Sequence, residues 1–272
     1  MQLSIRHTTR YSFSEPVVHA LQRLRLTPKE TQGQQILHWD MQYENATPQL
    51  EYDDQNFNTV TLLAVEPDAT EMTVTCSGTV QTQDKLGVIG RHAGHMPLWS
   101  FLGQTVITKL GPKLRELLRE VGPVPNEEVL PFLHDLSSQI SDEVAYTKGS
   151  TMVSSTAEEA VETGTGVCQD HAHIFIGLAR ASNIPARYVS GYLMMDDRIE
   201  QEATHAWAEA HVAGLGWVGF DISNGCIPDP RYVRVATGRD YRDAAPITGI
   251  RYGTTEEVLS VNVAVTQQSS DQ

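Results

Sequence analysis

The sequence has 272 residues, of which 20 are basic and 34 acidic, so its formal net charge is −14 at pH 7. An acidic chain lacks the basic face that nucleic-acid binding requires, and no segment reaches the roughly 18 to 20 apolar residues of a membrane span. We therefore expect neither a nucleic acid nor a membrane as partner. The three cysteines are odd in number and widely spaced, which argues against a disulfide framework and favours a reducing compartment. Because the first residues also lack a secretory-signal pattern, the sequence predicts a cytoplasmic protein.

The first part of the chain has the alternating pattern of β-strands. Alternation is visible at residues 3–8, 23–26, 59–62 and 72–76, and turn residues separate these segments, among them Thr47-Pro48. Short strands at such spacing are typical of a sandwich or partial barrel. We therefore expect a β-rich N-terminal domain over residues 1–95.

The pattern changes to helices after a glycine-rich linker. Helices are predicted at 112–120, from Asn126 as a cap, from a Thr156–Glu159 capping box, and from Cys168 onward. Strands are predicted again at 187–193, 204–212, 217–222 and 258–265. The order of strands, helices and strands predicts an α+β fold, with residues 96–272 as the second domain, including the C-terminal strand.

Cys168 stands where the fourth predicted helix begins. Gly164 and Gly166 precede it, and Asn183 followed by Pro185 marks the helix end. A thiol at a helix N-terminus faces unpaired backbone N–H groups and the positive end of the helix dipole, which favour the nucleophilic thiolate. A lone cysteine is more often a small buried apolar residue, so the catalytic interpretation depends on partners elsewhere.

The partners are expected on the β-hairpin that follows. Alternation puts His205 and Trp207 on one face of its first strand. If Val212 pairs with Gly216, Trp207 lies opposite Asp221, and Asp221 is the diagonal neighbour of His205. A slip by one residue would put the two side chains on opposite faces, so this register is a definite prediction. A carboxylate at Asp221 would fix the tautomer of His205 and support its charged form.

Three segments of the sequence together resemble a known family. They read Gly-Val-Cys-Gln-Asp at 166–170, Thr-His-Ala-Trp-Ala-Glu at 204–209 and Gly-Trp-Val-Gly-Phe-Asp at 216–221. This combination resembles the transglutaminase-like (transglutaminase-core) superfamily. The chain is similar to its bacterial branch, in which a β-rich domain precedes the core and whose members are often described as cysteine proteases.

The resemblance implies a papain-like core and a Cys-His-Asp triad. It implies Cys168 as nucleophile, His205 as general base and then acid, and Asp221 as the orienting residue. The implied chemistry is acyl transfer through a thioacyl-enzyme, with a peptide, protein or small amide as substrate and with no cofactor. Gly166, Gln169 and Trp207 are expected at the substrate site, where a glycine lets the substrate backbone approach closely.

Several alternatives remain open from the sequence. Cys168, His171, His173 and Cys226 could suggest zinc, but two histidines two positions apart on a helix point to different sides, and no metal is predicted. A rival function is a core that has lost activity and serves binding or assembly. The backbone N–H of Cys168 is a candidate first oxyanion donor, while the second donor, the choice between hydrolysis and amine transfer, and the oligomeric state stay open.

Overall fold

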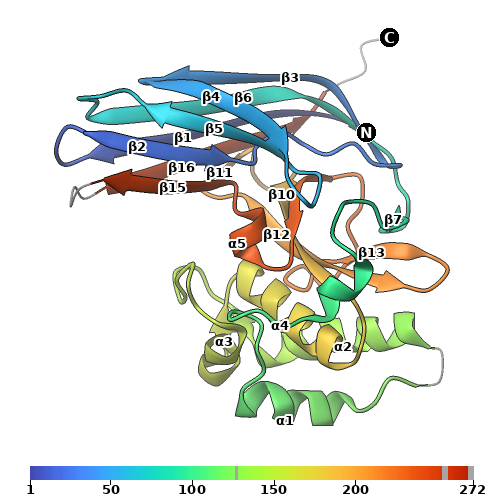
Figure 1. Ribbon diagram of the computed structural model, residues 1–272. Helices are drawn as coiled ribbons and strands as arrows, with labels where there is room; N and C mark the ends of the chain where they lie inside the picture. The colour runs from blue at the N-terminus through green and yellow to red at the C-terminus, as the bar shows by residue number, and fades with distance from the viewer. Residues whose placement is uncertain (126–127, 253–256, 269–272) are drawn as a thin grey trace.

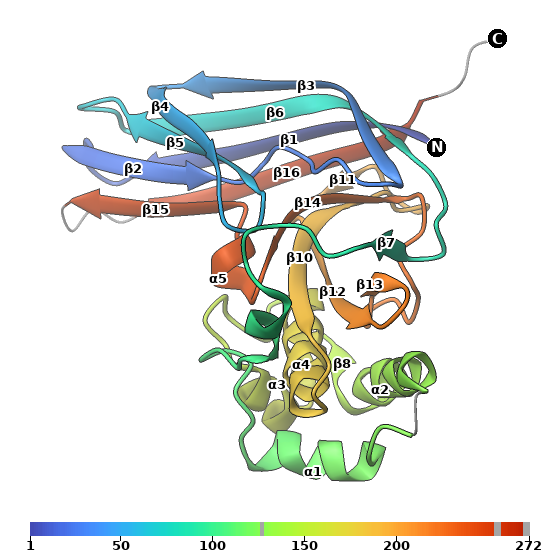
Figure 2. The same cartoon turned by 45° about the vertical axis from the view of Figure 1, so that its right-hand side comes forward.

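A sandwich of two strand-rich sheets lies at one end of the protein, helices lie at the other, and a third large sheet lies between them (Figure 1). The computed structural model describes residues 1–125, 128–252 and 257–268. The view turned by 45° shows the same order of layers (Figure 2). Strands, then helices, then strands follow one another along the chain, which confirms the predicted α+β class.

The sandwich is built from strands in which buried and exposed side chains alternate. In β1 (Gln2–Phe13), every second residue from Leu3 to Phe13 is buried. Leu63 and Met72 belong to the apolar cluster that fills the space between the two sheets. In spatial order, the first sheet consists of β11 (Glu200–Gln201), β16 (Glu257–Gln267), β1, β6 (Glu71–Thr82) and β3 (Gln34–Glu44), and the second of β15 (Ile247–Tyr252), β2 (His19–Leu24), β5 (Thr59–Val65) and β4 (Ala46–Asp53).

Strands from the C-terminal part of the chain complete both sheets of the sandwich. β16 pairs along the length of β1, and β15 pairs with β2. The strand expected at 258–265 is therefore present, but its hydrogen-bonded partner lies at the N-terminus and not in the central sheet. A division at residue 95 thus assigns β15 and β16 to the core although they pair with the sandwich, and the two-domain boundary stays a prediction.

The turn predicted at Thr47-Pro48 is wrong, because both residues lie within β4. This strand is at the edge of its sheet, and its register shifts between Pro48 and Leu50. Proline lacks the backbone N–H of a ladder, and an edge strand with a bulge accommodates that loss.

The central sheet carries the hairpin expected at 204–222 and packs against helix α4. Buried Ala206, Ala208 and Ala210 belong to the same apolar cluster as the buried residues of α4, and such small side chains let the helix lie close to the sheet. The central sheet consists of β14 (Tyr232–Gly238), β10 (Ala186–Leu193), β12 (His205–Val212), β13 (Gly216–Phe220) and β7 (Val88–Gly90), and β8 (Ala145–Tyr146) pairs with β9 (Thr165–Gly166).

The four predicted helices are present and follow the predicted caps with one exception, whereas the short helices at 98–102 and 241–244 were not predicted. Their bounds are η1 (Leu98–Leu102), α1 (Pro112–Val121), α2 (Val129–Glu143), α3 (Ala157–Thr163), α4 (Cys168–Ala181) and α5 (Tyr241–Ala244). Thr156 and Glu159 form the predicted capping box of α3. α2 has Glu128 at its N-cap without a side-chain cap, and the predicted cap, Asn126, lies outside the described residues.

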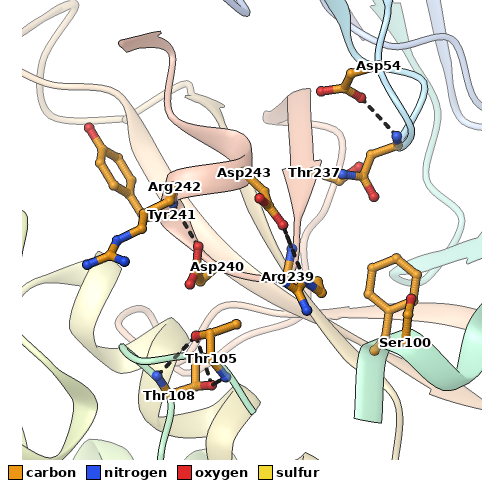
Figure 3. A network of polar contacts seen from close by, with 12 residues as sticks. Asp54, Ser100, Thr105, Thr108, Thr237, Arg239, Asp240, Tyr241, Arg242 and Asp243 are labelled. Carbon is orange, nitrogen blue, oxygen red and sulfur yellow. Dashed lines mark hydrogen bonds and ion pairs between the residues drawn. The ribbon is translucent and has the colours of Figure 1, made fainter. Parts of the chain in front are cut away.

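A polar junction joins the sandwich to the central sheet. The Asp54 carboxylate accepts hydrogen bonds from the backbone of Asn56 at 2.8 Å and of Asn58 at 3.1 Å, which shapes a loop beside Thr237 of β14 (Figure 3). The same view shows Asp243 bound to Arg239 after β14. The end of β14 therefore lies between a loop from the N-terminal part of the chain and the Arg239–Asp243 contact that follows the strand.

Candidate active site

Helix α4 begins at Cys168, as the sequence predicts, and an aspartate fixes its first turn. Asp170 Oδ2 accepts hydrogen bonds from the Val167 backbone N–H at 2.8 Å and from the Thr151 hydroxyl at 2.6 Å. The thiol of Cys168 is half-buried, whereas Asp170 is buried. The carboxylate therefore ties Val167 and the loop at Thr151 to the first helical turn and holds Cys168 at the positive end of the helix dipole.

The hairpin has the predicted register and brings His205 to Asp221. Val212 pairs with Gly216 and Ala208 with Phe220, as alternation and turn position predict. His205 Nε2 donates a hydrogen bond to Asp221 Oδ2 at 2.6 Å. The distance is that of a short charge-assisted hydrogen bond, which fixes the ring orientation.

The electrostatics of this pair favour a charged imidazole. Burial alone would lower the pKa of His205, but hydrogen bonds with Asp221 and Cys168 and their charges raise it to about 10. Burial likewise opposes ionisation of Asp221, yet the hydrogen bond and charge of His205 lower the pKa of that carboxyl below its usual value. The same ring thus interacts with the Cys168 thiol and is held by the Asp221 carboxylate.

Cys168 and His205 line one cleft of about 810 Å³. Its walls carry both charge signs and several hydroxyl groups, from residues that include Tyr146, Lys148, Tyr188, Arg198, Glu202 and Tyr241. This volume is within the range of sites that hold a small molecule or a short segment of chain. The thiol is therefore accessible from a space large enough for a substrate.

The three residues expected at the substrate site occupy different places. Gln169 lines the cleft, and its amide donates to the carbonyl of Val153 at 3.0 Å. Gly166 is buried, and a Cβ atom there would lie 2.8 Å from the Cβ of Asp170, so this glycine makes room for the cap of α4. Trp207 is 2% exposed and stacks on His205 with ring centroids 6.2 Å apart. Gly166 and Trp207 are absent from the cleft lining and support the site from behind.

The two histidines of α4 have separate structural partners, in agreement with their predicted divergence. His171 Nε2 donates to the Val144 carbonyl at 2.9 Å, and its Nδ1 accepts from the Ser223 hydroxyl at 2.8 Å. His173 Nε2 accepts from the Tyr241 backbone N–H at 3.1 Å. Over the described ranges, no group of three His, Cys, Asp or Glu side chains is arranged to hold a metal ion.

The sequence interpretation missed three residues that support the site. Asp170 had a usable signal, because an acidic residue at the third helical position is a capping pattern. Asn224 and Tyr232 donate to Asp221, each at 2.7 Å, but neither shares a recognisable spacing with it. Tyr232 lies in β14, a strand that the sequence analysis did not predict.

Among residues 1–125, 128–252 and 257–268, no helix is long and apolar enough to cross a membrane.

The fold resembles a known crystal structure over almost its whole length. A protein of Cytophaga hutchinsonii, named "Putative Cysteine Protease", superimposes with a TM-score of 0.77 at 23% sequence identity, covering 99% of this chain and 92% of that one. At this identity the match establishes the shared fold.

Relatives are found in mycobacteria. The uncharacterized protein Rv2569c of Mycobacterium tuberculosis is 37% identical over 174 residues, which are 59% of this chain and 55% of the relative. The match thus spans about half the length of that relative. The uncharacterized protein ML0607 of Mycobacterium leprae is 27% identical over 285 residues and aligns over 98% of this chain and 99% of its own length.

Family models match both parts of the chain. Residues 3–81 match the bacterial transglutaminase-like N-terminal region, and residues 117–222 match the transglutaminase-like superfamily core. The second range contains Cys168, His205 and Asp221. The chain therefore belongs to the transglutaminase-like superfamily, in the bacterial arrangement in which a strand-rich N-terminal region precedes the core.

Proposed function

We propose that the protein is a cysteine-dependent enzyme that transfers acyl groups from amides, with Cys168 as nucleophile, His205 as base and acid, and Asp221 as orienting residue. The observation that carries the proposal is that Cys168 and His205 line the same open cleft and interact there, while His205 Nε2 is hydrogen-bonded to Asp221. A nucleophile, its base and an orienting carboxylate in contact are the elements of covalent acyl-transfer catalysis.

The reaction follows from these contacts. The Cys168 thiolate attacks the amide carbonyl carbon, and the carbonyl π electrons move to the oxygen. When the tetrahedral intermediate collapses, the C–N bond breaks and His205 gives its proton to the leaving nitrogen. Water or an amine then attacks the thioester, His205 takes the proton of this nucleophile, and the C–S bond breaks to restore Cys168.

The N-terminus of α4 supports the negative charge that develops on the carbonyl oxygen. The backbone N–H groups of the first helical turn have no acceptor within the helix, so that of Cys168 can donate to the oxyanion. The cleft lining mixes Lys148 and Arg198 with Glu202. This mixture favours a peptide, protein or small amide over a substrate of strong single charge.

Thiol labelling across pH tests the proposal against the rival of an inactive binding module. Cys168 should react with iodoacetamide at pH values where an ordinary thiol is slow, and His205→Ala should remove that advantage. Cys226 is the internal control, because it is also half-buried but burial raises the pKa of its thiol. If Cys168 labels no faster than Cys226 at neutral pH, the triad is inactive and the binding module is favoured.

Intact-mass measurements identify the reaction. A panel of peptide amides should leave a thioacyl adduct on the wild type and none on Cys168→Ala. Adding a primary amine separates the outcomes, since transfer puts the amine into the product and hydrolysis does not.

We also propose a cytoplasmic location, with which the three free cysteines agree.

A further inference from the structure

The carboxylate of Asp221 is held by more than His205. Its Oδ2 also accepts hydrogen bonds from the Tyr232 hydroxyl and the Asn224 amide, both at 2.7 Å. Asn224 is three positions along the chain in an adjoining turn, whereas Tyr232 belongs to strand β14. Tyr232 thus fixes the carboxylate from a separate structural element.

The Tyr232 hydroxyl has a defined direction. Its hydrogen points to Asp221 Oδ2, so its oxygen accepts from the Cys226 thiol, whose Sγ lies 3.3 Å away. Burial and the charge of Asp221 raise the pKa of Tyr232, which keeps the hydroxyl protonated. The ring is 6% exposed and packs edge-on against Trp207, with centroids 5.4 Å apart. Tyr232 therefore has little freedom to turn away.

The N-terminal part of the chain fixes β14 in turn. β14 is an edge strand of the central sheet, and two amide side chains pair with its outer backbone edge. Gln34 accepts from the Arg234 N–H at 2.8 Å and donates to the Arg234 carbonyl at 2.7 Å. Asn58 makes the same pair of bonds with Thr237, at 2.9 and 2.8 Å. Each amide thus replaces a missing neighbouring strand.

We propose that Tyr232 is a positioning residue that holds the Asp221 carboxylate against His205, and that Gln34 of the N-terminal domain keeps Tyr232 in place through β14. The N-terminal domain then has a defined contribution to the site on the other side of the central sheet. This inference rests on the proposed roles of His205 and Asp221, but the contact itself is measurable without any substrate.

Two readouts test the inference in Tyr232→Phe, which keeps the buried ring and removes the hydroxyl. The NMR resonance of the His205 Nε2 proton should shift, because the acceptor oxygen loses one donor and its position changes. Alkylation of Cys168 at neutral pH should slow by about tenfold, the effect of losing a hydrogen bond to a charged group. Gln34→Met keeps the side-chain length but loses both bonds to Arg234 and a third one to the Lys29 carbonyl. It should change both readouts in the same direction by a smaller factor.

Tyr192→Phe is the matched control. The Tyr192 hydroxyl is also buried and hydrogen-bonded, to His7 Nδ1 at 2.9 Å, but it contacts no residue of the proposed triad. Tyr192→Phe should leave the His205 Nε2 proton resonance and the alkylation rate of Cys168 unchanged. If Tyr232→Phe has the same His205 Nε2 proton resonance as the wild type, the role of Tyr232 is refuted. If Gln34→Met has the wild-type resonance and alkylation rate, the contribution of the N-terminal domain is refuted. If Tyr232→Phe fails to fold, Gln34→Met decides alone. Slow alkylation of Cys168 in the wild type would instead refute the proposed function, while the NMR comparison would still test this inference.

Discussion

Val212 pairs with Gly216 across the β12–β13 hairpin, and this pairing determines that Asp221 meets His205. Gly216 has a φ of +85°, and a Cβ atom at this position would overlap the Gly90 carbonyl oxygen of strand β7. The turn and the neighbouring strand thus both require glycine here. The register of the hairpin, and with it the contact between base and carboxylate, depends on this residue.

Gly216→Ala is expected to destabilise the protein by more than about 2 kcal/mol, because it combines backbone strain with a steric overlap. Gly214→Ala is the matched control: Gly214 also has a positive φ, +83°, but no atom lies within 4 Å of its added Cβ. It should cost only about 1 kcal/mol. Urea unfolding of both variants measures the difference, and equal losses would contradict the overlap at Gly216.

Local signals in the sequence were sufficient for the four helices α1 to α4 and for the hairpin, but not for the short helices η1 and α5. The capping box of α3, the start of α4 and the pairing of Val212 with Gly216 each depend on residues that are close together in the chain. Because the hairpin register follows from its loop, the contact between His205 and Asp221 could be predicted as well.

Pairings between distant segments could not be predicted in this way. β15 finds its partner, β2, more than 200 positions away. β3 does carry a local signal, because Trp39, Met41 and Tyr43 alternate with polar residues, but the sequence analysis did not predict this strand. β14 is buried throughout and shows no alternation. The contact between Tyr232 and Asp221 depends on the placement of β14, so no spacing in the sequence could indicate it.

Asp170→Ala should cost about 0.5 to 2 kcal/mol of stability, because it removes the acceptor that caps the first turn of α4. It should also slow alkylation of Cys168, whose position depends on that turn. Asp170→Asn retains an oxygen that can accept from Val167 and should show less than half of either loss. Urea unfolding and thiol labelling check both variants, and an equal effect of Asn and Ala would mean that the carboxylate charge, not the cap, matters.

Glu209 is a buried carboxylate that contacts Arg187 at 2.6 Å and Arg234 at 2.6 Å. Glu209→Ala leaves two buried guanidinium groups without this partner and should cost about 3 to 5 kcal/mol. Glu257→Gln is the control. Glu257 pairs with Arg251, but its side chain is 43% exposed, and such exposed ion pairs contribute less than about 1 kcal/mol. The losses in the free energy of unfolding of the two variants, relative to the wild type, should therefore differ several-fold.

Asp221→Asn should reduce turnover of any amide substrate by at least about 100-fold, because the amide carries no charge to stabilise the imidazolium and can hold the wrong tautomer. The fold should persist, since the substitution preserves shape. Asp229→Asn serves as control, because Asp229 lies in the following loop and pairs with Arg231 at 2.7 Å, outside the triad. A comparable loss of turnover in both variants would remove the special role of Asp221.

The raised pKa of His205 makes the stability of the protein depend on pH in a definite direction. Its pKa is about 10 in the folded state against 6.5 as its ordinary value, so between these values the folded state binds more protons at this ring. The stabilisation is fully present below pH 6.5 and is lost as the pH rises through about 10. Free energies of unfolding for the wild type and His205→Gln, measured at pH 6, 8 and 10, should therefore differ most at pH 6 and least at pH 10. A difference that stays constant over this range would mean that His205 is neutral in the folded protein and that the charged pair with Asp221 does not form.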